Sequence, residues 1–220
     1  MLKKKMIKFG KSFKDVDKIK SNFFSQNNLL IKRQSKINKL YVAQPKRNKC
    51  KACNKILRGK FFINHNIKYI ECKNCTHING KYQDTKKFAD QIYIDEKANY
   101  SKGYKENNIK HYFLRQKKIY DPKAEFLKKN FKSPETIKVL DIGAGSGYFV
   151  SSLLDKKFKN AQGLEVSKNQ VSFGKNIFKA IKKDPSKLTQ ASFDEIVQEV
   201  KTTNFSCISM IGVLEHMVDM

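Results

Sequence analysis

The chain has 220 residues and a formal net charge of +26, with 46 Lys and Arg against 20 Asp and Glu. This length accommodates one medium-sized domain and a smaller one. No stretch reaches the roughly 18 consecutive apolar residues of a membrane span, and the N-terminus lacks the apolar core of a secretory signal, so we expect a cytoplasmic protein with reduced cysteines.

The positive charge does not by itself identify a polyanionic partner. Of the basic residues, 42 are Lys and four are Arg, whereas Arg is the side chain favoured for bidentate recognition of phosphates and bases. Lys, Asn and Ile are abundant together and share AT-rich codons, so a biased genome can account for much of the charge. A functional electrostatic surface is the alternative.

Residues 1–45 are rich in Lys, with scattered apolar residues and no clean amphipathic period. Because Asn27 and Asn28 interrupt the pattern, we expect a basic, loosely packed extension. Binding of this arm to a membrane surface is an alternative.

Residues 46–82 contain four of the five cysteines, in two Cys-x-x-Cys pairs with 18 residues between them. Two such turns can present four thiolates to one Zn²⁺ at about 2.3 Å. Because so small a segment cannot bury enough surface to fold unaided, the metal would supply much of its folding energy. We therefore predict a zinc ribbon with a closed structural site, whose ligands are Cys50, Cys53, Cys72 and Cys75.

The other uses of these cysteines are weaker. Disulfides need an oxidising compartment, a redox pair needs no matched partner pair, and an iron–sulfur cluster is uncommon at this spacing. His65 and His77 could each replace a cysteine ligand, but four cysteines suffice.

Residues 83–136 form a polar connector that contains several tyrosines. The apolar spacing predicts helix from about 109 to 130, interrupted near Asp121 and Pro122, where Asp121 can cap a second helix. The tyrosines either pack against the neighbouring sheet or shape the mouth of an active site.

Residues 137–220 alternate strand and helix patterns, as a doubly wound parallel sheet requires. Strands are expected at 137–142, 161–166 and 205–211, with a poorly marked one within 183–190, and helices at 147–157, 168–181 and 193–201. Ser167 is a plausible cap, and Cys207 is expected to be a small core residue. The predicted fold class is α/β, a Rossmann-like doubly wound sheet.

A glycine-rich turn follows the first of these strands, with Asp141 at the strand end and glycines at 143, 145 and 147. Such a turn at a helix start lets a ligand approach the backbone closely. A dinucleotide fingerprint needs a sixth-position glycine, where this chain has Tyr148, which argues against NAD or FAD. Glu165 ends the second strand, where a carboxylate can accept hydrogen bonds from ribose hydroxyls.

The segment from Asp141 to Gly147, with Glu165 and the later Val213-Leu-Glu-His216, resembles class I S-adenosylmethionine-dependent methyltransferases. The resemblance implies S-adenosylmethionine as cofactor. Asp141 would orient its methionine part, and His216 would act as a general base or shape the pocket. The cofactor-binding residues implied are Asp141, Gly143, Gly145, Gly147, Glu165, Leu214 and Glu215.

With the cysteine pairs, the arrangement resembles a bacterial group of zinc-ribbon-bearing class I methyltransferases, some of which act on sugars or surface-polysaccharide precursors. Two features depart from it. The polar residue that contacts adenine has only weak candidates, Ser192 and Asp194. The fold also normally continues beyond the position of Met220 with a fifth strand and an antiparallel pair, so we expect a C-terminally truncated chain.

These observations favour methyl transfer to a small-molecule or sugar-type acceptor. One alternative is an RNA methyltransferase whose ribbon and lysines contact phosphates. The other is a non-catalytic, zinc-dependent interaction module with an incomplete cofactor domain.

Overall fold

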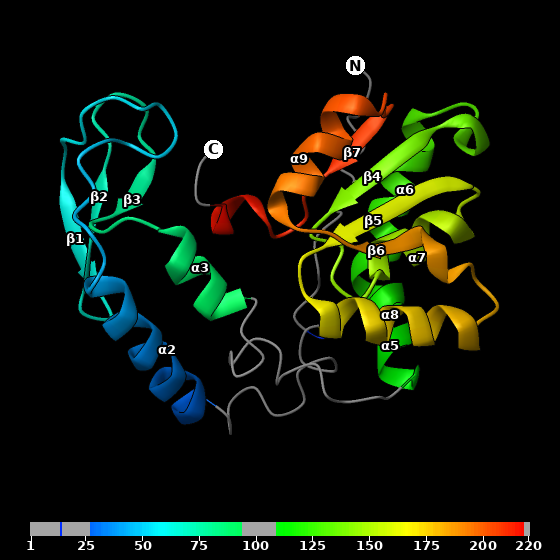
Figure 1. Cartoon of the computed structure of the whole chain (residues 1–220), viewed down its shortest axis with the longest axis horizontal. Helices are drawn as coiled ribbons and strands as arrows, with labels where there is room; N and C mark the ends of the chain where they lie inside the picture. Colours follow the sequence, from blue (N-terminus) through cyan, green and yellow to red (C-terminus); the bar gives the residue numbers. More distant parts are fainter. Residues whose placement is uncertain (1–13, 15–26, 94–108, 218–220) are drawn as a thin grey trace, which may run out of the picture. The chain divides into compact units, whose positions relative to one another are not determined.

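The computed structural model describes residues 14, 27–93 and 109–217 (Figure 1). By their contacts these residues fall into two compact units. The sheet unit contains residues 109–212. The N-terminal unit contains residues 27–93 together with 213–217. Among the described residues, no helix is both long enough and apolar enough to cross a membrane.

The N-terminal unit is built around a three-stranded antiparallel sheet in the order β1-β2-β3. His65 and Asn66 connect β1 to β2, and both have positive φ (47° and 63°), as a type I′ hairpin turn requires. The elements of this unit are α2 (Asn27–Val42), β1 (Phe61–Asn64), β2 (Ile67–Glu71), β3 (Ile78–Gly80), α3 (Lys86–Tyr93) and a 3₁₀ turn, η4 (Leu214–His216).

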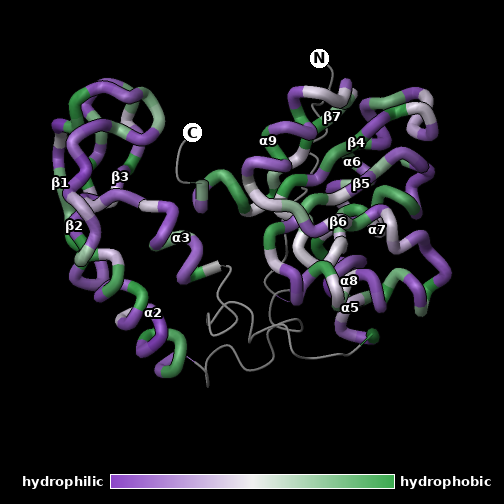
Figure 2. Tube along the Cα trace, viewed as in Figure 1, coloured by the Kyte–Doolittle hydropathy of each residue, from purple (hydrophilic) through white to green (hydrophobic). Residues whose placement is uncertain are grey.

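Helix α2 lies within the segment expected to be a loose extension. Hydrophobic and hydrophilic residues alternate along it (Figure 2), and none of its side chains is buried. Asn27 and Asn28 begin the helix and do not interrupt it. Its C-terminal half is held by two polar contacts, from Asn38 Nδ2 to His65 O (2.8 Å) and from Tyr41 Oη to Tyr82 O (2.6 Å). Helix α2 is therefore stabilised by contacts with residues distant in the sequence, which an amphipathic pattern within the helix does not predict.

The sheet unit has the predicted α/β architecture, a parallel four-stranded sheet in the order β6-β5-β4-β7 with helices on both faces. Val139 packs in a core with residues of α6, α7 and α8, whereas its neighbour Leu140 packs with Ile196 of α9. The elements are α5 (Ile109–Arg115), α6 (Asp121–Asn130), β4 (Lys138–Ile142), α7 (Tyr148–Asp155), β5 (Asn160–Glu165), α8 (Lys168–Ala180), β6 (Leu188–Gln190), α9 (Phe193–Thr202) and β7 (Cys207–Ser209).

The strands at the two ends of this sheet are short, and β7 is shorter than the strand predicted at 205–211. β7 pairs with β4 over three residues only, and Cys207 within it is half-buried beside the core, where burial raises its pKa. β6 is also three residues long and pairs with β5. Ser167 caps α8 as expected, because its side chain accepts a hydrogen bond from the Gln170 N–H.

Helices α5 and α6 are continuous through a π-helical turn at Gln116–Tyr120. The expectation that Asp121 caps a second helix is wrong: Tyr120 precedes α6, and Asp121 Oδ1 accepts a hydrogen bond from Ser152 Oγ of α7 (2.7 Å). Gln116 is buried and also contacts α7, accepting from Ser151 Oγ (3.2 Å). Side-chain contacts with α7 thus stabilise the continuous helix at the point where the sequence predicted an interruption.

Gly163 of β5 permits the close approach of the turn that follows β4. A Cβ at this position would lie 2.6 Å from Ala144 Cβ and 2.8 Å from Val150 Cγ2. We predict that Gly163→Ala lowers the free energy of unfolding by about 1–3 kcal/mol through overpacking, measured by urea denaturation. Thr189→Ala, at an exposed strand position, is the control and should change it by less than about 0.5 kcal/mol. Equal stability of the two variants would contradict this packing.

Candidate functional site

Asp141 is the penultimate residue of β4, near the carboxyl edge of the sheet, and lies directly opposite Ser209 of β7. Its side chain is buried, and Oδ1 accepts a hydrogen bond from Ser209 Oγ at 2.7 Å. Burial raises the pKa of Asp141 to about 7, with a further upward contribution from the charge of Glu165, while the Ser209 hydrogen bond acts in the opposite direction. Asp141 therefore titrates near neutral pH.

The glycine-rich turn connects Asp141 to α7. The N–H groups of Gly143 and Ala144 both donate to Leu164 O of β5, at 2.8 and 3.0 Å. Gly145 and Gly147 have positive φ (56° and 75°), and a Cβ on Gly147 would meet Leu188 Cδ1 at 2.5 Å. Backbone conformation and the close approach of Leu188 therefore both require glycine at position 147, and the positive φ favours glycine at position 145.

Glu165 ends β5 and is in direct contact with this turn. Its Oε2 accepts a hydrogen bond from the Gly145 N–H, and its Oε1 accepts one from the Ser167 N–H, both at 2.9 Å. The structure thus brings together the glycines and the acid that sequence spacing had related. An ionised carboxylate has about four acceptor positions, and these two hydrogen bonds use two of them.

A group of stacked tyrosines lies beneath the turn. Tyr112 of α5 is buried and donates from its hydroxyl to Ser146 O at 3.2 Å. Its ring stacks on Tyr148 with centroids 4.3 Å apart, and Tyr120 stacks on Tyr148 at 5.4 Å. For Tyr112 and Tyr120 the packing interpretation is confirmed. The hydroxyl contact also gives Tyr112 a part in holding the turn, which its spacing did not indicate.

Three other predicted site residues, Leu214, Glu215 and His216, form η4, which groups with the N-terminal unit. Glu215 Oε1 lies 3.9 Å from His216 Nε2 within this turn. Their assignment to the cofactor site stays a prediction. Of the two adenine candidates, Ser192 caps α9 by accepting from the Glu195 N–H (3.3 Å), while Asp194 is exposed.

The four cysteines of the two Cys-x-x-Cys pairs converge in the N-terminal unit. Their sulfur atoms all lie within 4.8 Å of one another. Cys50 Sγ and Cys75 Sγ are 3.6 Å apart, and Cys53 Sγ and Cys72 Sγ are 3.8 Å apart. A tetrahedral site with Zn–S bonds of about 2.3 Å has sulfur–sulfur edges of about 3.8 Å, so the sulfur positions fit zinc.

The two turns that carry these cysteines have the same backbone pattern. The Cys50 N–H donates to Lys55 O and the Asn54 N–H donates to Cys50 O. In the second turn, the Cys72 N–H donates to His77 O and the Thr76 N–H donates to Cys72 O. Neither His65 nor His77 joins the sulfur cluster among the described residues. The four-cysteine ligand set is therefore the one that the geometry fits.

Hydrogen bonds prepare two of the thiols for ionisation. Burial raises the pKa of Cys50, but N–H donors from Cys53, Asn79 and Ala52 outweigh it and lower the pKa to about 6. The pKa of Cys53 is lowered chiefly by the Lys55 backbone N–H. The His77 N–H also favours the Cys75 thiolate, yet burial and the neighbouring cysteines raise its pKa. Four adjacent thiolates need a cation to coexist, which also fits a metal.

Asp141 makes the stability of the sheet unit depend on pH. The pKa of Asp141 in the folded state, about 7, lies above its ordinary value of 3.8. The stabilisation of the fold by protonated Asp141 is therefore complete below about pH 4 and is lost as the pH rises through 7. We predict that, between pH 4 and pH 8, the free energy of unfolding of wild type falls by on the order of 2–4 kcal/mol relative to that of Asp141→Asn, measured by denaturant unfolding. The exposed control, Asp194→Asn, should keep the wild-type profile. Parallel profiles for wild type and Asp141→Asn would refute the assignment.

The comparisons with known proteins agree with this geometry. Residues 112–220 match a family model described as "Methyltransferase domain". No curated protein and no solved structure matches the chain. The matched range begins at Tyr112 and includes Asp141, the glycine-rich turn and Glu165. Residues 112–220 are therefore a methyltransferase domain on a parallel α/β sheet, and the protein is an S-adenosylmethionine-dependent methyltransferase.

Proposed function

We propose that this methyltransferase acts on a small-molecule or sugar-type acceptor and that Glu165 and the glycine-rich turn hold its cofactor. The contact between Glu165 Oε2 and the Gly145 N–H carries the proposal, because it sets a carboxylate beside the main chain of the glycine-rich turn at the carboxyl edge of the sheet. The acceptor class is supported by the resemblance to zinc-ribbon-bearing methyltransferases of sugars. The scarcity of Arg, four residues in the chain, also speaks against a polyanionic substrate.

In this proposal, each of the residues at the carboxyl edge of the parallel sheet contacts a different part of the cofactor. The spare acceptor positions of Glu165 receive the two ribose hydroxyls, and the glycine-rich turn lets the ligand lie against the backbone. Asp141 orients the amino acid part. When bound, S-adenosylmethionine supplies an electrophilic methyl group on its sulfonium sulfur. The protein's contribution is to hold the acceptor nucleophile in line with that group, and His216 takes the proton that the acceptor releases.

We further propose that the cysteine cluster binds one structural Zn²⁺. The support is the match between the observed sulfur separations, 3.6 and 3.8 Å, and those of a tetrahedral site. With all four positions taken by cysteine, such a site has no place for a substrate or a reactive water. Its contribution is to the folding of the small ribbon.

The role of Glu165 can be tested by ligand binding. We predict that Glu165→Ala weakens binding of S-adenosylhomocysteine by about 10- to 100-fold, as expected for the loss of hydrogen bonds to a charged group, measured by titration calorimetry. Glu135→Ala, at an exposed position outside the edge, should bind as wild type does. Undetectable binding to the wild-type chain at millimolar ligand would contradict the cofactor assignment itself.

Metal removal tests the zinc proposal. We predict about one Zn per chain by elemental analysis after metal-replete purification, and loss of amide protection in residues 46–82 when a chelator removes it. Protection in β4 and β5 should be unchanged, because these strands belong to the other unit. Less than about half a metal per chain would contradict the site.

One observation favours RNA as the acceptor instead. All four side chains of β1 are exposed, and Lys68 Nζ lies 3.7 Å from the centroid of the Phe61 ring. Exposed aromatic and cationic groups of this kind suit single-stranded nucleic acid. Strongly salt-dependent RNA binding would support this reading, and no binding at low salt would remove it. A non-catalytic interaction module would instead retain zinc without binding S-adenosylhomocysteine.

A further inference from the structure

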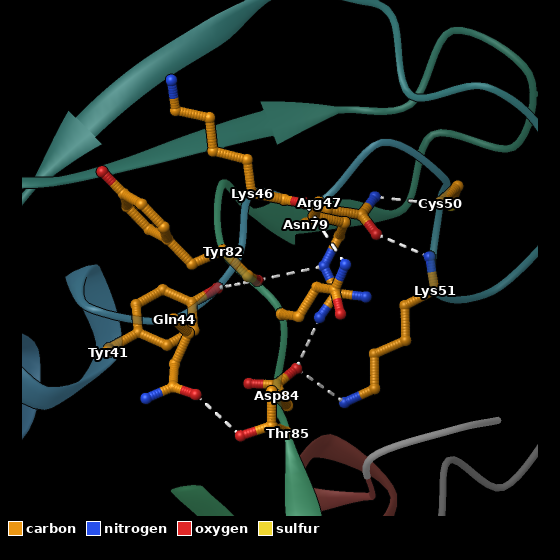
Figure 3. Close-up of polar contacts among 11 residues, drawn as sticks. Tyr41, Gln44, Lys46, Arg47, Cys50, Lys51, Asn79, Tyr82, Asp84 and Thr85 are labelled. Carbon is orange, nitrogen blue, oxygen red and sulfur yellow. Dashed lines mark hydrogen bonds and ion pairs between the residues drawn. The ribbon is translucent and has the colours of Figure 1, made fainter.

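A buried amide stands next to the cysteine cluster. Asn79 of β3 is 2% exposed, and all of its amide contacts are internal (Figure 3). Its Nδ2 donates to Cys50 Sγ (3.4 Å) and to His77 O (3.0 Å), while its Oδ1 accepts from the Lys51 N–H (2.8 Å). A polar side chain at this depth is tolerated because it is hydrogen-bonded on both sides.

These contacts join the two Cys-x-x-Cys turns to each other. Cys50 and Lys51 belong to the first turn, whereas His77 O closes the second by accepting from the Cys72 N–H at 2.9 Å. The Asn79 amide therefore bridges the two halves of the sulfur cluster. The N–H donated to Cys50 Sγ also directs that sulfur and withdraws charge from it, as groups around a metal ligand do.

Lys51 continues the network away from the cysteines. Its Nζ lies 3.2 Å from Asp84 Oδ2, which Arg47 Nη2 also contacts at 2.8 Å (Figure 3). The Lys51 and Arg47 side chains are only 8% and 11% exposed, so the charges of two largely buried cations are balanced by the one Asp84 carboxylate. Arg47 Nε in turn donates to Tyr82 O at 3.2 Å.

The same network reaches both helices of the N-terminal unit. Tyr82 O is also the acceptor for Tyr41 Oη of α2. Thr85, next to Asp84, donates to Gln44 Oε1 (2.7 Å) and accepts from the Phe88 N–H at the start of α3 (3.2 Å). Polar contacts thus run from Cys50 through Asn79 to the end of α2 and the start of α3.

We infer that Asn79 is a positioning residue of the metal centre: it holds Cys50 Sγ toward the other sulfurs and transmits metal loading to the packing of α2 and α3. This inference rests on the proposed zinc site. It assigns a role to the Arg47–Asp84–Lys51 cluster as well, as the link between a folded ribbon and the start of α3.

The experiment uses the full chain and two variants, Asn79→Ala and Asn79→Asp. The aspartate keeps the shape and the acceptor for Lys51 but loses the donor to Cys50 Sγ, so it remains informative if the alanine variant does not fold. The matched control is Asn64→Asp, the same charge change at an exposed position of the same sheet. Zn²⁺ affinity is measured by chelator competition, and Co²⁺ is substituted to record the thiolate charge-transfer spectrum.

Both Asn79 variants should bind Zn²⁺ about 10- to 100-fold more weakly, the usual effect of removing a group that orients a metal ligand, and their Co²⁺ spectra should shift. Asn64→Asp should stay within about twofold of wild type. By hydrogen exchange, Zn²⁺ should slow the amides of α3 in wild type and much less in the variants.

If wild type binds no metal, the proposed zinc site fails, and the inference fails with it. If wild type binds one metal but the Asn79 variants match its affinity and spectrum, the inference is overturned and the zinc site stands. Reduced thermal stability with unchanged affinity and spectrum would mark Asn79 as a packing residue only, which also overturns it. Equal slowing of α3 exchange in wild type and variants overturns the transmission to the helices.

Discussion

Two backbone N–H groups converge on the carboxylate of Glu165, and the geometry of the carboxyl edge of the sheet depends on this convergence. One comes from Gly145 in the turn after β4, the other from Ser167 before α8. Glu165 is only 8% exposed, and burying a carboxylate to this extent costs free energy unless hydrogen-bond donors satisfy its oxygens. Because they come from separate segments, one side chain fixes the end of β5, the glycine-rich turn and the start of α8 together.

The support of the turn continues on its other side. Tyr112 reaches Ser146 O from α5, a helix that lies before the first strand of the sheet in the chain. Its stacking on Tyr148 sets α5 against the first turn of α7. The turn is therefore held both by the Glu165 carboxylate and by a packed aromatic group, so its backbone is preorganised.

The sequence predicted those parts of the structure that depend on local spacing. Alternating glycines after a strand predict a turn with positive φ, and an acid at the end of the next parallel strand falls beside that turn, so the contact between Glu165 and Gly145 followed from spacing. Two Cys-x-x-Cys turns can bring their sulfur atoms together in few ways, so the cluster that contains Cys50 was also predicted correctly. Ser209 and Asn79 were missed, because each acts through a partner about 30 or more residues distant, Asp141 and Cys50. Helix α2 was missed for the same reason, since tertiary contacts outweigh its weak periodicity.

The two cysteine turns have the same backbone pattern, but their sulfur atoms are not equally accessible. In each turn the first cysteine, Cys50 or Cys72, is buried, and the second, Cys53 or Cys75, is more exposed. Only the buried Cys50 receives the Asn79 amide. If the cluster binds Zn²⁺ as proposed, chelators and oxidants would meet the more exposed Cys53 and Cys75 first. In the proposed zinc site, this asymmetry would give the metal one direction of entry and exit in an otherwise repeated motif.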